Sequence, residues 1–132
     1  MSSEQTTASK PVKHPGPDHP ITIEPNPARV IVRAAGRVLA DTSAALTLRE
    51  ADYPPVQYIP VRDVDQALLE RSDHTSYCPF KGDASYYDVP ALGPVGANAV
   101  WEYRSPYDAV SQIEGHLAFY RDRVEIEQQA GD

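Results

Sequence analysis

The chain has 132 residues, of which 41% are hydrophobic and 23% are charged. This composition is sufficient for the core of one domain and excludes a chain that is disordered throughout. The 19 acidic residues outnumber the 12 Lys and Arg residues and give a formal net charge of −7, which argues against a protein that binds the phosphate backbone of nucleic acids. A single cysteine, Cys78, excludes an intramolecular disulfide and a multi-cysteine zinc site.

The sequence also indicates the cellular compartment in which the protein is expected. No apolar run approaches the roughly 18 residues that a membrane-spanning helix needs. The polar N-terminus lacks the apolar stretch of a secretory signal peptide. Together with the unpaired thiol of Cys78, these patterns favour a cytoplasmic protein. We expect neither a metal ion nor another cofactor.

Composition divides the chain into three parts. Residues 1–19 are polar, contain no aromatic residue and include Pro11, Pro15 and Pro17, so they predict a disordered N-terminal arm. Residues 128–132 predict a flexible tail. The remaining part, residues 20–127, predicts a single folded domain without internal repeats.

The folded part is predicted to be mainly β, with roughly eight to ten short strands. Alternating and β-branched stretches place strands at residues 29–33, 37–41, 46–48, 56–59, 76–78, 84–89, 99–103, 117–120 and 123–127. Gly36 suits the positive φ of a hairpin turn between the first two strands. The last two are expected to pair as a closing hairpin, with Val124 and Ile126 facing inward. Residues 64–69 fit a strand and a helical turn equally well.

Prolines and capping residues predict two further local features. The strand at 56–59 lies between paired prolines and Pro60, which favours the edge of a sheet or a bend. One short helix is expected after Ser105, a suitable N-cap, with Pro106 at its first position. Gly115 has the properties of the residue that ends it. The apolar stripe of this helix consists of Ala109, Val110 and Ile113.

Side chains that can carry chemistry gather at residues 73–87, DHTSYCPFKGDASYY. Alternate residues of a strand share a face, so His74, Ser76 and Cys78 are expected to point in the same direction. The turn that follows predicts that Lys81 lies within about 8–10 Å of His74 and Cys78. These groups should border a hydrated cleft, because polar groups without partners are costly in a dry core.

Each of these side chains has a functional and a structural interpretation. Lys81 and the backbone of Gly82 can receive a phosphate or a carboxylate, or form a solvated turn. Cys78 can be a nucleophile activated by His74 and Lys81, or a small buried hydrophobic residue. A zinc site formed by His74, Cys78 and His116 is disfavoured, because no close pair of ligands exists.

Two other groups have alternatives of the same kind. Asp63 and Asp65 have the spacing of the carboxylate pair that holds Mg²⁺ in nucleotidyltransferases, but the Gly-Ser motif of those enzymes is missing, which favours a solvated turn. His116 can face a pocket or interact with the end of the predicted helix.

The aromatic residues provide candidates for a binding surface, since every Trp, Tyr and Phe lies between positions 53 and 120. The candidates for a wall that stacks a flat ring are Tyr58, Tyr86, Tyr103 and Trp101. Tyr87 is a further candidate for contact with a ligand. The alternative is core packing, which must include some of them. Tyr86 and Tyr87 are adjacent in a predicted strand and must therefore point to opposite faces.

Four sequence blocks stand out in a fixed order. They are YPPVQYIP (53–60), DHTSYCPFKG (73–82) followed by YY (86–87), ANAVW (97–101) and GHLAFY (115–120). Together they resemble the DUF427 family over residues 21–127. The resemblance implies a tent-like pair of antiparallel sheets, a bacterial or fungal protein, and the nucleotidyltransferase-like label that some classifications give the family. Many relatives carry His where this chain has Tyr53, so no role is assigned there.

The sequence leaves three hypotheses for the function. The favoured one is a domain that binds a small anionic or nucleotide-like ligand in a polar and aromatic pocket. Lys81 would supply the charge, and His74 and His116 would supply hydrogen bonds. The second hypothesis is an enzyme, either a transferase that uses Cys78 and His74 or a nucleotidyltransferase-like protein. The third is an interaction module that docks a protein or pairs with a second copy of the chain.

Overall fold

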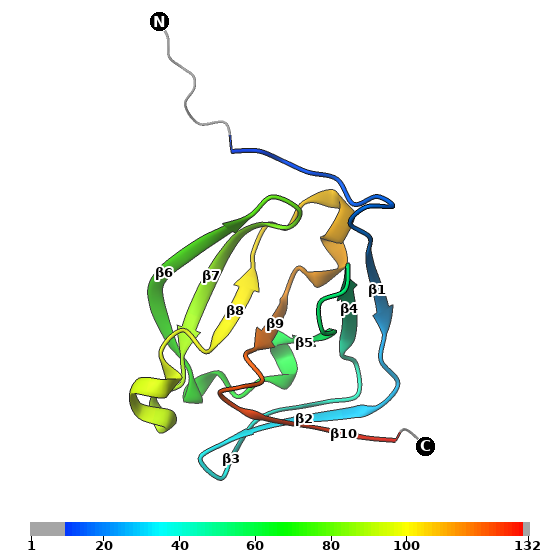
Figure 1. Ribbon diagram of the computed structural model, residues 1–132. Coiled ribbons are helices and arrows are strands. Elements are labelled where there is room, and N and C mark those ends of the chain that lie inside the picture. Colours follow the sequence, from blue (N-terminus) through cyan, green and yellow to red (C-terminus); the bar gives the residue numbers. More distant parts are fainter. Residues whose placement is uncertain (1–9, 131–132) are drawn as a thin grey trace, which may run out of the picture.

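Ten strands form the framework of the protein (Figure 1). The computed structural model describes residues 10–130, and its strands are β1 (Ile21–Pro25), β2 (Arg29–Ala34), β3 (Arg37–Thr42), β4 (Leu46–Glu50), β5 (Val56–Pro60), β6 (Glu70–Cys78), β7 (Gly82–Asp88), β8 (Val100–Tyr103), β9 (His116–Phe119) and β10 (Glu125–Gln129). The short 3₁₀ segments between them are η1 (Val61–Asp63), η2 (Gln66–Leu68), η3 (Pro90–Gly96) and η4 (Asp108–Ile113). Within this range no helix has the length and apolar character to cross a membrane.

The strands form two antiparallel sheets. The larger has the order β1-β4-β5-β9-β8-β7-β6, and the smaller has the order β10-β2-β3. This arrangement confirms the predicted mainly β class with two antiparallel sheets. Figure 1 shows the large sheet as a curved wall, with the three strands of the small sheet lying across one end of it.

Buried side chains form two clusters, because consecutive residues of the central strands point to opposite faces. Tyr58 belongs to one cluster and Ile59 to the other. The cluster between the two sheets includes Val30, Val32, Leu39, Ile59, Val100, Leu117 and Phe119. The cluster on the other face consists of Leu48, Tyr58, Ala84, Tyr86, Tyr103, Val110, Ile113 and Ala118. The strands at the centre of the large sheet are thus covered on both sides.

Two hairpins match the sequence prediction. Between β2 and β3, Ala35 (φ 52°) and Gly36 (φ 76°) both have positive φ, as a tight two-residue turn requires. Between β6 and β7, Cys78 lies opposite Gly82, and the Lys81 N–H donates to the Cys78 carbonyl oxygen at 3.1 Å. The second turn brings the chemistry-bearing segment back on itself, as predicted.

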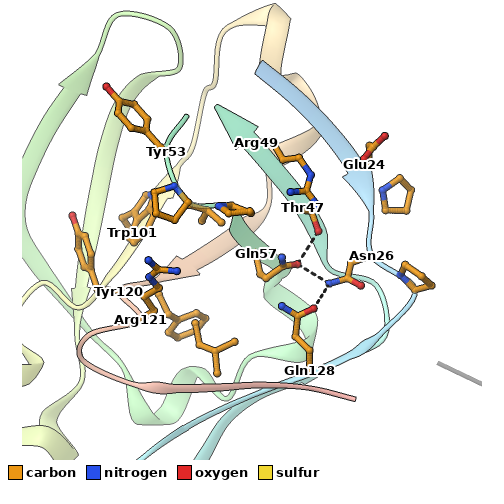
Figure 2. A pocket seen from close by; sticks show the side chains of 17 residues that line it. Glu24, Asn26, Thr47, Arg49, Tyr53, Gln57, Trp101, Tyr120, Arg121 and Gln128 are labelled. Carbon is orange, nitrogen blue, oxygen red and sulfur yellow. Dashed lines mark hydrogen bonds between the residues drawn. The ribbon is translucent and has the colours of Figure 1, made fainter. Parts of the chain in front are cut away.

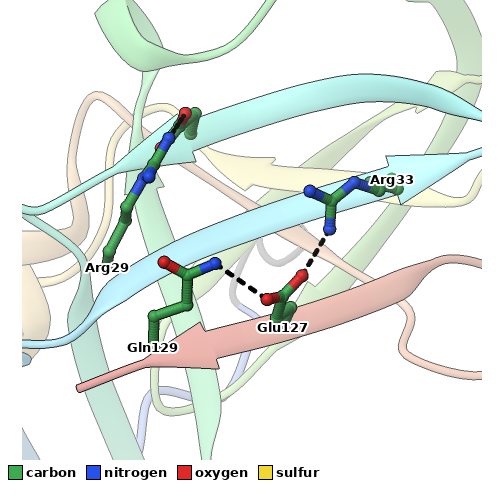
Figure 3. Close-up of polar contacts among 5 residues, drawn as sticks. Arg29, Arg33, Glu127 and Gln129 are labelled. Carbon is green, nitrogen blue, oxygen red and sulfur yellow. Dashed lines mark hydrogen bonds and ion pairs between the residues drawn. The ribbon is translucent and has the colours of Figure 1, made fainter.

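Ion pairs on the outer surface of the small sheet join its three strands (Figure 3). Arg29 donates two hydrogen bonds to Asp41 on β3, at 2.8 and 2.6 Å. Arg33 donates to Glu127 on β10, which also accepts from Gln129 at 2.8 Å. Such exposed pairs add little free energy, but they favour the register that places β2 between β3 and β10.

The predicted closing hairpin is wrong. β9 pairs with β5 and β8, and β10 pairs with β2 in the other sheet. Because both edges of β9 are already occupied, β10 has no free edge of β9 to join. The inward orientation of the last strand is nevertheless confirmed, since Val124 is 7% exposed and Ile126 packs against the cluster between the sheets.

The predicted short helix is present as the 3₁₀ segment η4, but its predicted start is wrong, and residues 10–130 contain no α-helix. η4 begins after Tyr107 rather than Ser105 and has no side-chain cap, and Val110 (φ −127°, ψ 28°) interrupts it. Six residues are too few to form a stable helix alone, so burial of Val110 and Ile113, both 0% exposed, decides the local shape. Gly115 follows with a φ of 77°, as expected for a residue after a helical end.

The prediction that the prolines keep β5 from a central position and favour an edge or a bend is wrong as well. β5 lies between β4 and β9. Pro54 and Pro55 precede the strand, and Pro60 is its last residue. None of the three therefore removes an N–H from the interior of the hydrogen-bonded ladder, which is the reason proline avoids central strands.

The N-terminal part makes contacts that the sequence did not predict. β1 is an additional strand that pairs with β4. Before it, the Lys13 N–H donates to the Pro79 carbonyl oxygen at 2.9 Å, and the Tyr77 hydroxyl donates to the Pro11 carbonyl oxygen at 2.7 Å. Residues 10–19 of the predicted arm therefore lie against the β6–β7 hairpin. The rest of that arm, and residues 131–132 of the predicted tail, lie outside the described residues.

Candidate functional site

An open cavity of about 770 Å³ lies between the large sheet and the last strand (Figure 2). Its size is within the range of small-molecule sites in proteins. The side chains that the argument below uses are Asn26, Thr47, Arg49, Tyr53, Gln57, Trp101, Tyr120, Arg121 and Gln128. Trp101 is the only one of the sequence-predicted site residues in the lining of this cavity.

One side of the cavity is aromatic. The ring centroids of Trp101 and Tyr120 are 4.5 Å apart and their planes are tilted by 45°. The Trp101 indole N–H donates to the Tyr58 hydroxyl at 3.2 Å, which fixes the orientation of this half-buried ring. Burial and a hydrogen bond with Tyr86 raise the pKa of Tyr120, so its hydroxyl stays neutral at physiological pH. Tyr53, 60% exposed, belongs to the same lining.

The opposite side carries a connected set of amide groups (Figure 2). Asn26 Nδ2 donates to Gln57 Oε1 at 2.9 Å and to Gln128 Oε1 at 3.0 Å. Thr47 Oγ1 donates to the same Gln57 oxygen at 3.1 Å. Asn26 is itself held by the Ala28 N–H, which donates to its Oδ1 at 2.9 Å. We call Asn26, Thr47, Gln57 and Gln128 the amide floor.

Two positive charges complete the lining. Arg49 on β4 and Arg121 after β9 are both exposed, and neither forms an ion pair with a carboxylate of residues 10–130. Glu24 on β1 is the acidic residue of the lining, and Figure 2 shows its carboxylate beyond Arg49, on the side away from Gln57. The cavity therefore combines two unpaired cations, an aromatic wall and an amide floor.

Comparison with known protein families identifies the family of this chain. A family model described as a domain of unknown function, DUF427, matches residues 22–130. The chain belongs to the DUF427 family. The match confirms the resemblance that the four sequence blocks indicated, and it extends over the whole cavity lining. A search among curated proteins finds no match to the chain.

The anion-binding lysine expected from the sequence has a different position in this DUF427 domain. Lys81 is 7% exposed, and its Nζ donates to Glu50 Oε1. The expectation that its ammonium borders a hydrated cleft is wrong, because the turn directs the side chain inward to a carboxylate. His19 Nε2 lies 2.7 Å from the other oxygen of Glu50, and its ring stacks on Phe80 at 3.9 Å.

Glu50 is the centre of this buried ion network. Burial by itself would raise the pKa of Glu50, but the hydrogen bonds from Lys81 and His19 outweigh it, and the pKa lies below its usual value of 4.5. The carboxylate is therefore ionised at neutral pH and neutralises Lys81. An external anion would have to displace Glu50 to reach this ammonium, which disfavours the role that the sequence suggested.

His74 and Cys78 share a face, as predicted, but nothing joins them among the described hydrogen bonds. The exposed ring of His74 lies 4.5 Å from that of Tyr86, whose hydroxyl is 2.8 Å from Ser76 Oγ. Cys78 is half-buried and packs against the cluster that contains Tyr86. This environment suits a small hydrophobic residue, and the catalytic role of the pair stays a prediction.

The candidate tyrosines mostly belong to the core. Tyr58 is 1% exposed and Tyr86 is 9% exposed. Tyr87 points to the opposite face from Tyr86, as predicted, and packs against the cluster between the sheets. Its hydroxyl donates to Glu102 at 2.8 Å, and burial together with this bond raises the pKa of Tyr87 to about 12. Their expected contacts with a ligand are untested.

The remaining candidates have structural contacts. His116 Nδ1 lies 3.0 Å from the Glu114 carbonyl oxygen, at the end of η4 rather than in the cavity. Asp63 accepts from Thr42 Oγ1 at 2.7 Å. Asp65 caps η2 by accepting from the Ala67 N–H, which resolves part of the ambiguous 64–69 segment as a helical turn. Across residues 10–130, no three His, Cys, Asp or Glu side chains are grouped to hold a metal ion.

Proposed function

We propose that this DUF427 domain binds a small anionic ligand with a flat ring in the cavity beside Trp101. The observation that carries the proposal is the position of Arg49 and Arg121. Both line a cavity with an aromatic wall, and neither is paired with a carboxylate of the described residues. In a chain with a formal net charge of −7, two such guanidiniums in one cavity favour an anion, which they can bind through charge-assisted hydrogen bonds.

The other parts of the lining support a ring on the same ligand. Trp101 and Tyr120 present aromatic surfaces on which a flat ring can stack, and Trp101 is held in place by Tyr58. The amide floor supplies directional hydrogen bonds. Nucleotides are one class of compound that combines a flat ring with an anionic group, and aromatic acids are another.

Calorimetric titration tests this proposal with adenosine monophosphate, adenosine and inorganic phosphate. We expect the monophosphate to bind more tightly than either of its parts, because it uses both the aromatic wall and the guanidiniums. Arg49→Ala and Arg121→Ala should each weaken its binding by roughly 10- to 150-fold, since a hydrogen bond to a charged group contributes roughly 1.5–3 kcal/mol. Arg37→Ala, an exposed position on β3, is the matched control and should bind normally.

An aromatic carboxylate such as naphthylacetate extends the same titration to ligands without phosphate. If neither anion binds the folded protein at millimolar concentration, the proposal is wrong. Equal weakening by Arg37→Ala and Arg49→Ala would also contradict it, because the charge effect would then be general rather than local.

The other hypotheses from the sequence stay predictions. A transferase that uses Cys78 would show a thiol that ionises near neutral pH, and thiol titration measures this. A nucleotidyltransferase-like reaction would need Asp63 and Asp65 to leave their present hydrogen bonds and hold Mg²⁺. Pairing with a second copy of the chain is tested by light scattering.

A further inference from the structure

We propose that the amide floor of the cavity selects an oxyanion head group, and that Asn26 is the positioning residue that sets this selectivity. The inference rests on the proposed ligand-binding function and adds the chemical class of the group that contacts the floor. It depends on the direction in which the amide groups of the floor are turned.

The orientation of Asn26 is fixed by the backbone. Its Oδ1 accepts from the Ala28 N–H at 2.9 Å, two residues further along the chain, which is a local turn typical of Asn. The amide nitrogen must then point away from this turn. Both of its hydrogens are used, since Nδ2 donates to Gln57 at 2.9 Å and to Gln128 at 3.0 Å.

This orientation determines that of both glutamines. An Asn nitrogen can only donate, so each glutamine must turn its carbonyl oxygen toward it. Gln57 is fixed a second time, because its Oε1 also accepts from Thr47 Oγ1 at 3.1 Å. The Nε2 groups of Gln57 and Gln128 consequently point away from Asn26, and neither donates to an acceptor of residues 10–130.

The floor therefore offers donors rather than acceptors. Gln57 and Gln128 line the same cavity as Arg49 and Arg121, which also donate only. A group with several acceptor oxygens and no N–H matches this set. A neutral amide head group would place its own donor against donors and leave polar groups unpaired, which a site built on hydrogen bonds rejects strongly. Carboxylates and phosphates share the required chemistry.

Three probes with the same ring test the head group in calorimetric titrations of the full chain. They are naphthylacetate, naphthyl phosphate and naphthylacetamide. Whichever of naphthylacetate and naphthyl phosphate binds better should bind at least about tenfold more tightly than naphthylacetamide. The probes share the ring, and only the acids have a head group without an N–H donor. The relative affinities of naphthylacetate and naphthyl phosphate show which oxyanion the cavity prefers.

The Asn26→Asp variant separates the positioning role from a merely structural one. The new carboxylate still accepts from the Ala28 N–H, but it cannot donate, so both glutamines should turn their nitrogens toward it and their oxygens toward the cavity. The preference should then shift toward the neutral probe: naphthylacetamide should gain about threefold or more, and naphthylacetate should lose at least about tenfold.

Two further variants control for the added charge of Asn26→Asp and for its failure to fold. Ser43→Asp adds the same charge at an exposed residue near Asn26; it should weaken the acids moderately and leave naphthylacetamide unchanged. Gln128→Met removes one donor from an exposed residue of β10 without adding charge. It should weaken the acids several-fold and serves if Asn26→Asp does not fold.

The outcomes distinguish this inference from the proposed function. Acids that bind through Arg49 and Arg121, but no more tightly than naphthylacetamide, would overturn the inference and leave the proposed function intact. A folded Asn26→Asp variant in which naphthylacetamide does not gain would also overturn it. If none of the three naphthyl probes binds, the inference is wrong, and the proposed function is wrong as well if adenosine monophosphate also fails to bind.

Discussion

The ammonium of Lys81 contacts the carboxylate of Glu50, 31 residues earlier in the chain. The two side chains are only 9% and 12% exposed. β4, which ends at Glu50, and the β6–β7 turn, which carries Lys81, are not neighbours in the large sheet. The pair therefore ties together two parts of the sheet that no backbone hydrogen bond joins.

Removing one partner of this pair should be costly. We expect Lys81→Met to lower the free energy of unfolding by about 3 kcal/mol, because the buried carboxylate of Glu50 then keeps only its contact with His19. The double variant Lys81→Met, Glu50→Leu should recover much of this loss, since it removes the buried carboxylate together with the ammonium. Urea denaturation measures both. A single variant within about 1 kcal/mol of the wild type would show that the pair contributes little.

The same carboxylate predicts a pH dependence. The pKa of Glu50 is lowered in the folded protein from its usual 4.5, so the folded state binds a proton less readily than the unfolded state. Its contribution to stability is complete above the unfolded pKa and is lost as the pH falls through the folded pKa. The free energy of unfolding should therefore decrease below about pH 4.5.

Denaturation of Glu50→Gln between neutral and acid pH is the matched experiment. This variant is less stable at neutral pH, because Lys81 loses its counter-charge, and the difference from the wild type should shrink as Glu50 is protonated at acid pH. The acid-side slope of the free energy of unfolding should be shallower than in the wild type. Parallel curves would mean that Glu50 does not titrate differently in the two states.

Gly82 should tolerate substitution poorly. Its φ is +111°, and an added Cβ would lie 3.4 Å from the Ser105 carbonyl oxygen. We expect Gly82→Ala to destabilise the protein by about 1–2 kcal/mol through backbone strain. Gly16→Ala is a suitable control, since a Cβ there meets nothing within 4 Å. Thermal unfolding should separate the two variants, and equal melting temperatures would contradict the strain argument.

His19 should contribute to stability although it precedes the first strand. It stacks on Phe80 with ring centroids 3.9 Å apart and lies 2.7 Å from Glu50. His19→Ala should therefore cost about 1 kcal/mol. His14→Ala, at an exposed position of the same segment, is the comparison. If the two variants unfold at the same denaturant concentration, the contacts of His19 are not stabilising.

Much of the framework could be predicted from local sequence. β2 and β3 are β-branched and joined by a residue suited to positive φ, and the β6–β7 hairpin is marked by its turn. The partner of β10 could not be predicted in this way. Val124 and Ile126 indicate which face is buried, but not which sheet the strand joins, because that depends on the free edge of β2 about 90 residues earlier.

The candidate site was harder to predict from the sequence, because its residues also have partners that lie far away in the chain. Lys81 looked available because its partner, Glu50, is distant in sequence. The amide floor consists of residues that each look like ordinary surface positions, and only the fold brings them together. One signal was present: Thr47 and Arg49 alternate with Leu48, so they must face away from its cluster. The alternation of polar and apolar residues predicts which face of the strand carries Thr47 and Arg49. It does not predict which other residues lie across the cavity from them.

The hydrogen bond between Asn26 and Gln128 joins residues 102 positions apart. Because a ribosome releases the N-terminal residue first, β2 and the amide groups near it leave the exit tunnel long before β10 is synthesised. β2 can pair early with β3, but its other edge stays open until β10 has been synthesised. The cavity consequently cannot form before the nine strands that precede β10 have been made, and a chain that stops short of β10 exposes an unprotected strand edge instead of a binding site.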